Sequence, residues 1–219
     1  MEVNPDVLHP NQHPNQKTDQ LKGKSGAAME TTNNNTNNNR EGFQIGQAVM
    51  YGLNGRCEVV GIESLTAGGT SQSFYKLEQR KLGPIAKQPN KKETAIWVPT
   101  DAASKKGLRP LIRKDEVDAI MAILQDREAY FPTDLPFNKI QPQFEQAMLE
   151  EGATGFAKVV SYMKTLQAKK PVLESTQQKY FDGVYGVLLR EVAEVTEQTL
   201  GQTEELFEKA LRNKGHVDH

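Results

Sequence analysis

The sequence predicts an α+β protein in which a small antiparallel β-barrel is followed by a small all-helical domain. Between residues 43 and 98, short alternating apolar stretches are separated by turn residues every ~8–15 positions, which is typical of a small barrel. After residue 107 the apolar residues recur with a period of about 3.6, which is typical of amphipathic helices. We therefore divide the chain into a disordered polar tail (1–41), a barrel (42–112), a helical domain (113–200) and a terminal helix turn and tail (201–219).

The polar tail lacks the apolar pattern of a folded segment. It is rich in asparagine, glutamine and proline and includes the tract Thr31–Asn39, TTNNNTNNN. Only 37% of the 219 residues of the whole chain are hydrophobic, and the net charge is −1. A segment of this composition buries too little apolar area to offset its conformational entropy, so we predict that it is disordered.

Four strand patterns make up the predicted barrel. Asn54-Gly55 separates the first two strands, and this dipeptide is the strongest short signal for a hairpin. Gly68-Gly69 predicts the turn before the third strand, and a long basic loop, Arg80–Glu93, precedes the fourth. The strands are expected at Phe43–Met50, Glu58–Ile62, Ser73–Glu78 and Thr94–Val98.

The helical domain is predicted to begin with an amphipathic helix, Val117–Leu124. Prolines 132, 136 and 142 indicate a linker after this helix. Two glycines inside the last long helix, at positions 183 and 186, predict a kink or a close helix contact. The later helices are expected at Gln143–Glu151, Gly155–Ala168 and Glu174–Leu200, with a final amphipathic turn at Glu204–Leu211.

Composition excludes several classes of function. The single cysteine, Cys57, excludes disulfides within the chain and cysteine-based metal sites, and it fits a reducing compartment. The four histidines, at positions 9, 13, 216 and 219, lie in the two tails, away from any preorganised catalytic site. The sequence contains no phosphate-binding glycine motif, and no apolar run approaches the ~18 residues of a membrane span. We therefore expect a cytoplasmic binding protein with no enzymatic activity, cofactor, metal, small-molecule substrate or membrane partner.

One block of the sequence resembles a known family. Residues 43–51 (FQIGQAVMY), the Asn54-Gly55 turn and residues 59–63 (VVGIE) resemble the opening of the CarD/CdnL-type bacterial transcription regulators. The resemblance covers about residues 43–124 and continues through residues 74–77 (FYKL), 97–99 (WVP) and 107–112 (GLRPLI). In the helical half, residues 157–160 (AKVV) are compatible with a helix of the family.

The resemblance implies a fold, partners and contact residues. The N-terminal half would be a Tudor/SH3-like barrel that binds the β subunit of RNA polymerase. The helices would contact promoter DNA without reading its sequence, and so stabilise the open complex. Family members insert an aromatic wedge into the minor groove, and Lys164 stands close to its place here. The implied polymerase-binding residues are Trp97, Leu65 and Tyr75, and the implied DNA-binding residues are Lys158, Tyr162, Lys164, Lys169 and Lys170.

The residue patterns leave alternatives open. Trp97 points outward if its neighbours face the barrel interior, or else the loop 79–93 covers it. The lysines between 158 and 170 form either a phosphate-contacting surface or a solvated helix face. Arg109 is expected to make a structural salt bridge between the barrel and the first helix. For the whole chain, the rival interpretation is an SH3-like adaptor that binds another protein, dimerises through its helices and does not contact DNA.

Overall fold

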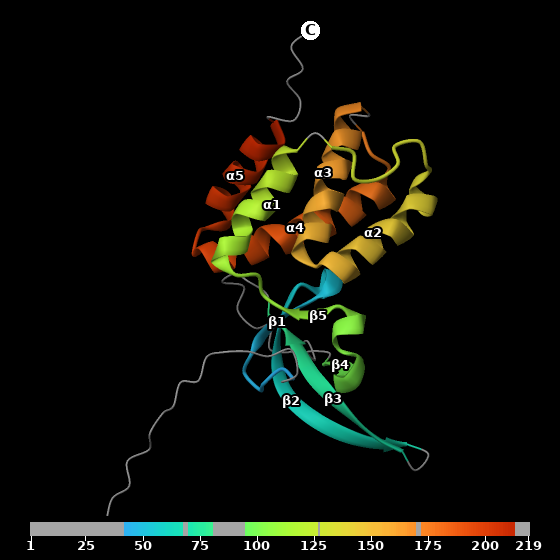
Figure 1. Ribbon diagram of the computed structural model, residues 1–219, viewed down its shortest axis with the longest axis vertical. Helices are drawn as coiled ribbons and strands as arrows, with labels where there is room; N and C mark the ends of the chain where they lie inside the picture. Colours follow the sequence, from blue (N-terminus) through green and yellow to red (C-terminus); the bar gives the residue numbers. More distant parts are fainter. Residues whose placement is uncertain (1–41, 68–69, 81–94, 127, 170–171, 213–219) are drawn as a thin grey trace, which may run out of the picture. The chain divides into compact units, whose positions relative to one another are not determined.

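The computed structural model describes residues 42–67, 70–80, 95–126, 128–169 and 172–212, and these belong to one unit. Within them the chain is an α+β protein, as predicted. A five-stranded sheet comes first in the sequence and five α-helices follow it, and Figure 1 shows the strands and the helices in separate halves. The predicted disordered tail and most of the predicted basic loop lie outside the described residues.

The sheet is entirely antiparallel, with the strand order β4-β3-β2-β1-β5. The Asn54-Gly55 turn lies between β1 and β2, as predicted, and Gly55 takes a φ of 69°, which glycine adopts at little cost. β2 and β3 form a long hairpin with a register shift between Val59 and Gly61. The strands are β1 (Ala48–Tyr51), β2 (Arg56–Ala67), β3 (Thr70–Gln79), β4 (Ile96–Pro99) and β5 (Leu108–Pro110).

The described strands form an open sheet. β4 and β5 lie at its two edges, and no pairing joins them among the described residues, so closure into a barrel is not confirmed. These two strands have only four and three residues, which leaves few backbone groups for closing the sheet. β5 was not among the strands expected from the sequence, because three residues are too few to establish an alternating pattern.

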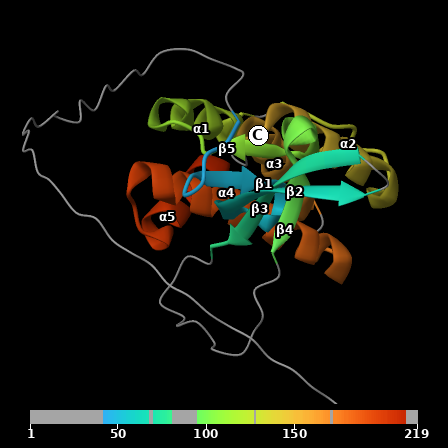
Figure 2. The ribbon, with the colours of Figure 1, turned by 90° about the horizontal axis from the view of Figure 1, so that it is seen from below.

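The five helices form the second half of the described chain. α3 contacts α1, α2 and α4, whereas α5 packs on α1 and α4 (Figures 1 and 2). The helices are α1 (Val117–Gln125), α2 (Phe137–Glu151), α3 (Ala153–Lys169), α4 (Ser175–Thr196) and α5 (Leu200–Arg212). α5 contributes Phe207 and Leu211 to the same core as the other helices, so the terminal segment through Arg212 is an integral part of the helical half.

α2 begins earlier than the sequence analysis predicted. Pro142 lies inside the helix on its exposed side, and not in a linker. Ile140, Phe144 and Met148 are spaced four residues apart and are buried in the helical core. The burial of this apolar face outweighs the one helical hydrogen bond that proline cannot donate.

The sequence predicted a kink or a close helix contact at Gly183 and Gly186, but the structure places a close helix contact at another glycine, Gly155. A Cβ atom at Gly155 would overlap the carbonyl oxygen of Ala147, so the close approach of α2 and α3 requires glycine there. Gly183 is exposed, with open space where a Cβ would lie, and it marks no close helix contact. The long final helix of the prediction is interrupted after Thr196, and α5 begins at Leu200.

Each half has its own hydrophobic core. The sheet core contains side chains from all five strands. The helical core contains residues of all five helices and also Met50 from β1. Met148 and Met163 fill the helical core, as expected for buried methionines at helical spacing.

Candidate protein-docking surface and nucleic-acid face

The strand register places an apolar surface on the side of the sheet that faces away from the sheet core. Residues paired across an antiparallel sheet share a face. Trp97 pairs with Lys76, Pro99 and Glu63 both pair with Phe74, and Leu65 pairs with Gln72. The intervening residues Tyr75, Leu77 and Val98 point to the core side, where they are buried. We call the outward-facing set of Leu65, Phe74, Lys76, Trp97 and Pro99 the Trp97 surface.

Trp97 is the largest exposed apolar side chain of this surface, with 39% of its area accessible. The Nζ atom of Lys76 lies 5.3 Å from the centre of the indole ring, in cation–π contact. The same ammonium group lies 3.3 Å from Oε1 of Glu63. The outward orientation of Trp97 is therefore confirmed, while residues 81–94 of the loop that was the alternative cover lie outside the described residues.

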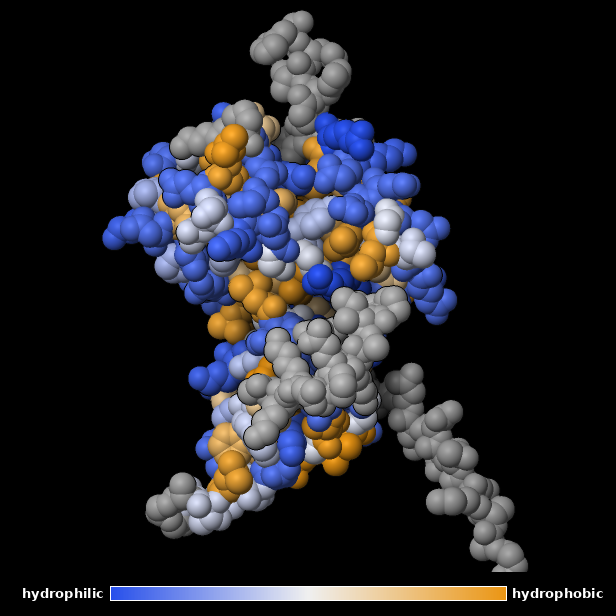
Figure 3. Space-filling view, turned by 180° about the vertical axis from the view of Figure 1, so that it is seen from behind, coloured by the Kyte–Doolittle hydropathy of each residue, from blue (hydrophilic) through white to orange (hydrophobic). Residues whose placement is uncertain are grey.

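Leu65 is exposed on the same surface, with 48% of its area accessible. Figure 3 shows that apolar side chains reach the molecular surface in the sheet half as well as in the helical half. Among the described residues, the large apolar side chains with substantial exposure are Ile45, Leu53, Ile62, Leu65, Trp97, Leu135, Leu149, Val172, Leu200 and Leu206. Trp97 and Leu65, which the resemblance implies as polymerase contacts, are thus both exposed on this side of the sheet.

Tyr75 does not belong to this surface, and its assignment as a contact residue is corrected. Only 4% of its area is exposed, because alternate residues of β3 point into the sheet core. Its hydroxyl accepts a hydrogen bond from the backbone N–H of Phe43 at 3.0 Å, and the two rings pack edge to face. Its neighbour Phe74 takes the outward position, opposite Glu63 and Pro99.

Two lysines of the predicted nucleic-acid face, Lys158 and Lys164, are paired with carboxylates. The Nζ atom of Lys158 lies 2.6 Å from Oε2 of Glu151. The Nζ atom of Lys164 lies 2.9 Å from Oε1 of Glu208 and rests near the rings of two aromatic residues of α4, Phe181 and Tyr185. A phosphate group would have to compete with these carboxylates for each ammonium.

Tyr162 lies inside the helical half, and its predicted contact with DNA is corrected. The side chain is 7% exposed, and its hydroxyl donates a hydrogen bond to the carbonyl oxygen of Pro132 at 3.2 Å. Burial, with a smaller contribution from the nearby carboxylate of Asp134, raises the pKa of this phenol above its usual range. The Tyr162 ring contacts the rings of Phe131 and Phe144, which shield it from solvent.

The other two predicted lysines and the net charge of the helical half also give little support to a nucleic-acid face. Lys169 is exposed at the end of α3, and Lys170 lies outside the described residues. Residues 113–212 contain 17 acidic and 12 basic residues, which gives the helical half a net charge of −5. A protein that binds DNA through its own electrostatic attraction carries the opposite sign.

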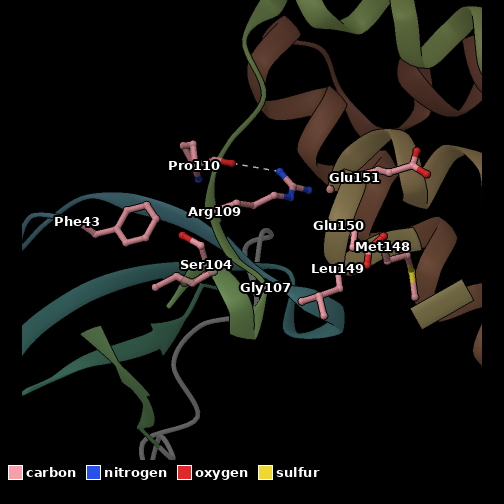
Figure 4. Close-up of a pocket in the computed structure, with 11 residues that line it drawn as sticks. Phe43, Ser104, Gly107, Arg109, Pro110, Met148, Leu149, Glu150 and Glu151 are labelled. Carbon is pink, nitrogen blue, oxygen red and sulfur yellow. Dashed lines mark hydrogen bonds between the residues drawn. The ribbon is translucent and has the colours of Figure 1, made fainter. Parts of the chain in front are cut away.

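A cavity of about 380 Å³ lies where the sheet meets the end of α2 (Figure 4). Its lining includes Phe43, Arg109, Leu149 and Glu150. The Arg109 guanidinium donates a hydrogen bond to the Pro110 carbonyl oxygen at 3.1 Å and binds a carboxylate of α4, so both of its terminal nitrogens already have acceptors. The lining shows no paired nucleophile and base.

Other reactive groups of the described chain are few. Burial raises the pKa of the Cys57 thiol from an ordinary value of 9.0 to about 11, so the thiol is unreactive at neutral pH. Within the described ranges, no group of three or more histidine, cysteine, aspartate or glutamate residues could hold a metal ion. No helix in this part of the chain is long and apolar enough to cross a membrane.

Two ion pairs join the sheet to α4: one was predicted with a different partner, and the other was not predicted. Arg109 forms the predicted structural salt bridge, but with Glu191 of α4 and not with the first helix. Arg56 binds Glu194 of the same helix. These pairs join residues 82 and 138 positions apart, and nothing in the local sequence signals a partner at that separation.

Comparison with known proteins does not decide between the interpretations. No protein-family model matches the chain, and no curated protein matches it. The resemblance to the CarD/CdnL regulators therefore rests on the residues quoted from the sequence.

Proposed function

We propose that this protein is a bacterial transcription regulator of the CarD/CdnL type, which docks on the β subunit of RNA polymerase through the Trp97 surface. The observation that carries the proposal is the exposure of Trp97 and Leu65 on one side of the sheet. In this proposal the five-stranded sheet is the Tudor/SH3-like barrel of the family. The protein would act in the bacterial cytoplasm without enzymatic activity.

The Trp97 surface has the composition of a docking site. An exposed tryptophan beside other apolar side chains is a typical centre of a protein interface, and its truncation commonly costs about 2 kcal/mol or more. Lys76 lies over the indole, and its ammonium group is already paired with Glu63 at the edge of the same patch. The complementary partner therefore presents an apolar pocket for the indole.

Docking would let the regulator stabilise the open promoter complex. A protein that binds the open complex more tightly than the closed one shifts their ratio, tenfold for each ~1.4 kcal/mol of differential affinity. In the proposal the helical half supplies this difference through contact with promoter DNA that is independent of sequence. The polymerase would supply most of the binding free energy, because the helical half is itself acidic.

A second candidate function is an adaptor that binds another protein and does not contact DNA. Two observations favour it: Lys158 and Lys164 are paired with carboxylates, and Tyr162 is buried. In this alternative the helical half serves protein contacts, including dimerisation, and the Trp97 surface remains the docking site.

Binding of the full chain to an isolated fragment of the polymerase β subunit tests the proposal. We expect Trp97→Ala to weaken binding about 30-fold, which corresponds to about 2 kcal/mol. Leu206→Ala, which truncates an exposed apolar side chain of α5, is the matched control and is expected to bind normally. Absence of binding by the unaltered chain, or equal binding by the Trp97→Ala variant, would refute polymerase docking through this surface.

Footprinting of promoter complexes then separates the two candidates. If the chain contacts DNA, adding it to polymerase and promoter extends the protected region, and Lys169→Glu reduces the extension. An unchanged footprint, combined with intact polymerase binding, supports the adaptor and rejects the DNA contact.

A further inference from the structure

Three side chains on neighbouring strands point from the sheet toward α4. Met50 of β1 pairs with Arg56 of β2 on one side and with Arg109 of β5 on the other, so the three share one face of the sheet. Met50 is 2% exposed and belongs to the helical core, whereas the preceding residue, Val49, belongs to the sheet core. This row is therefore the place where the sheet enters the helical half.

α4 presents two carboxylates to this row. Glu191 and Glu194 are three positions apart, a spacing that places them on one side of a helix. Oε1 and Oε2 of Glu191 accept hydrogen bonds from the two terminal nitrogens of Arg109 at 2.5 and 2.6 Å. Oε1 of Glu194 accepts one from Nε of Arg56 at 2.6 Å. Each arginine beside Met50 thus has its own carboxylate on the same helix.

The Glu191 carboxylate also holds the chain that leaves the sheet. Its side chain is 0% exposed, and Oε1 accepts a third hydrogen bond, from the backbone N–H of Ile112 at 3.0 Å. Ile112 lies in the connection between β5 and α1. One buried carboxylate therefore binds the last strand, through Arg109, and the segment that leads from it to the first helix.

We infer that Met50, Arg56, Arg109, Glu191 and Glu194 form a rigid joint that fixes the orientation of the sheet relative to the helical half. The turn Gly52–Asn54 also contacts α4, but the buried side chain of Met50 by itself would allow one half to turn about it. Ion pairs on either side of it, from strands whose backbones lie about 10 Å apart at ordinary strand spacing, oppose that rotation. The paired Arg109–Glu191 contact is directional, because both nitrogens must remain aligned with both oxygens.

The second ion pair, Arg56–Glu194, also opposes rotation of the sheet against the helices, because part of it is buried. Oε2 of Glu194 is buried and has no hydrogen-bond partner among the described residues. A rotation that removed Arg56 would leave the Glu194 carboxylate, whose Oε2 is buried although the side chain is 25% exposed, without the arginine that it binds, which is unfavourable. The joint does not depend on which partner binds the Trp97 surface, so its failure and that of the proposed function are distinguishable.

Distance measurements between spin labels on the two halves test the inference. One label is placed on the hairpin at Ser71→Cys and the other on α5 at Glu205→Cys, both exposed positions. The buried Cys57 stays unlabelled at neutral pH. We expect one narrow distance distribution for the otherwise unaltered chain. In the variant Glu191→Gln/Glu194→Gln, which keeps the size of both side chains, we expect the distribution to broaden at least twofold.

A control removes an ion pair within the helical half whose side chains are 27% and 35% exposed, against 23% and 25% for Arg56 and Glu194. Lys164→Gln breaks the contact with Glu208 and is expected to leave the distribution narrow. An unchanged width in the double variant, with its helical circular dichroism intact, overturns the inference, as does equal broadening by Lys164→Gln. If the double variant does not fold, Glu194→Gln alone decides: broadening supports the joint, and an unchanged width overturns it.

Discussion

Removal of Arg109 is expected to destabilise the protein more than removal of an exposed arginine. In Arg109→Ala the Glu191 carboxylate, which is 0% exposed, keeps only the Ile112 N–H among the hydrogen-bond donors described above. Breaking a buried ion pair from one side typically costs about 3–5 kcal/mol, because a buried charge is left uncompensated. The Arg109 side chain also packs over Gly152, and that contact is lost as well. We therefore expect the free energy of unfolding to fall by about 3–5 kcal/mol.

Urea unfolding followed by far-ultraviolet circular dichroism measures this loss. Arg113→Ala is the control, since Arg113 pairs with Asp115 at the surface and 72% of its side chain is exposed. Such pairs contribute about 0–1 kcal/mol. The double variant Arg109→Leu/Glu191→Leu removes both charges and is expected to recover part of the stability, because no charge remains buried without a partner. A loss below about 1 kcal/mol for Arg109→Ala would refute this reasoning.

Three further predictions concern single positions. Glu197→Gly is expected to raise the free energy of unfolding by about 0.5–1 kcal/mol, because Glu197 caps α4 with a φ of 58°, and thermal unfolding measures the gain. Gly155→Ala is expected to cost about 1–3 kcal/mol in urea unfolding, since its methyl group would overlap the Ala147 carbonyl oxygen; an unchanged midpoint contradicts the close packing of α2 on α3. The free energy of unfolding of the unaltered chain, minus that of the Cys57→Ala variant, is expected to be constant below pH 9 and to decline between pH 9 and 11. The decline occurs because, above the ordinary pKa of the thiol, only the unfolded chain ionises. A difference that stays constant across this range would contradict the burial of Cys57.

Local patterns predicted four of the five described strands but missed β5, and the predicted closure into a barrel is not confirmed. The alternation of Ile96, Trp97 and Val98 was enough to place the indole outward, because strand side chains alternate strictly between two faces. The same rule could not assign Phe74 and Tyr75, since both are aromatic and adjacent. That choice depends on the register with β2 and β4, which is a property of the folded sheet.

The basic face could not be judged from its own segment. Residues 158–170 contain four lysines and no acid, which indicates a positive surface when the segment is considered alone. The carboxylates that neutralise Lys158 and Lys164 come from α2 and α5, and the second lies 44 positions away. Electrostatic contacts between helices depend on how the helices pack, and periodicity within one helix carries no information about them.

Proline gave a misleading signal in α2 for a related reason. Pro142 indicated a linker, because proline interrupts helices in isolation. In the folded chain Ile140 and Phe144 bury the opposite side of that helix in a core of aromatic rings. Tertiary packing thus outweighed the local propensity.

The division of β1 between two cores has a consequence for how the chain can be divided. Val49 completes the sheet core, and the next side chain, Met50, completes the helical core. If the chain were divided near residue 112, the N-terminal fragment would expose Met50 between Arg56 and Arg109. The C-terminal fragment would have a cavity in its core where Met50 packed, beside the unpaired carboxylates of Glu191 and Glu194. Transfer of either half to another protein would therefore require a new surface to replace the contact between the sheet and the helices.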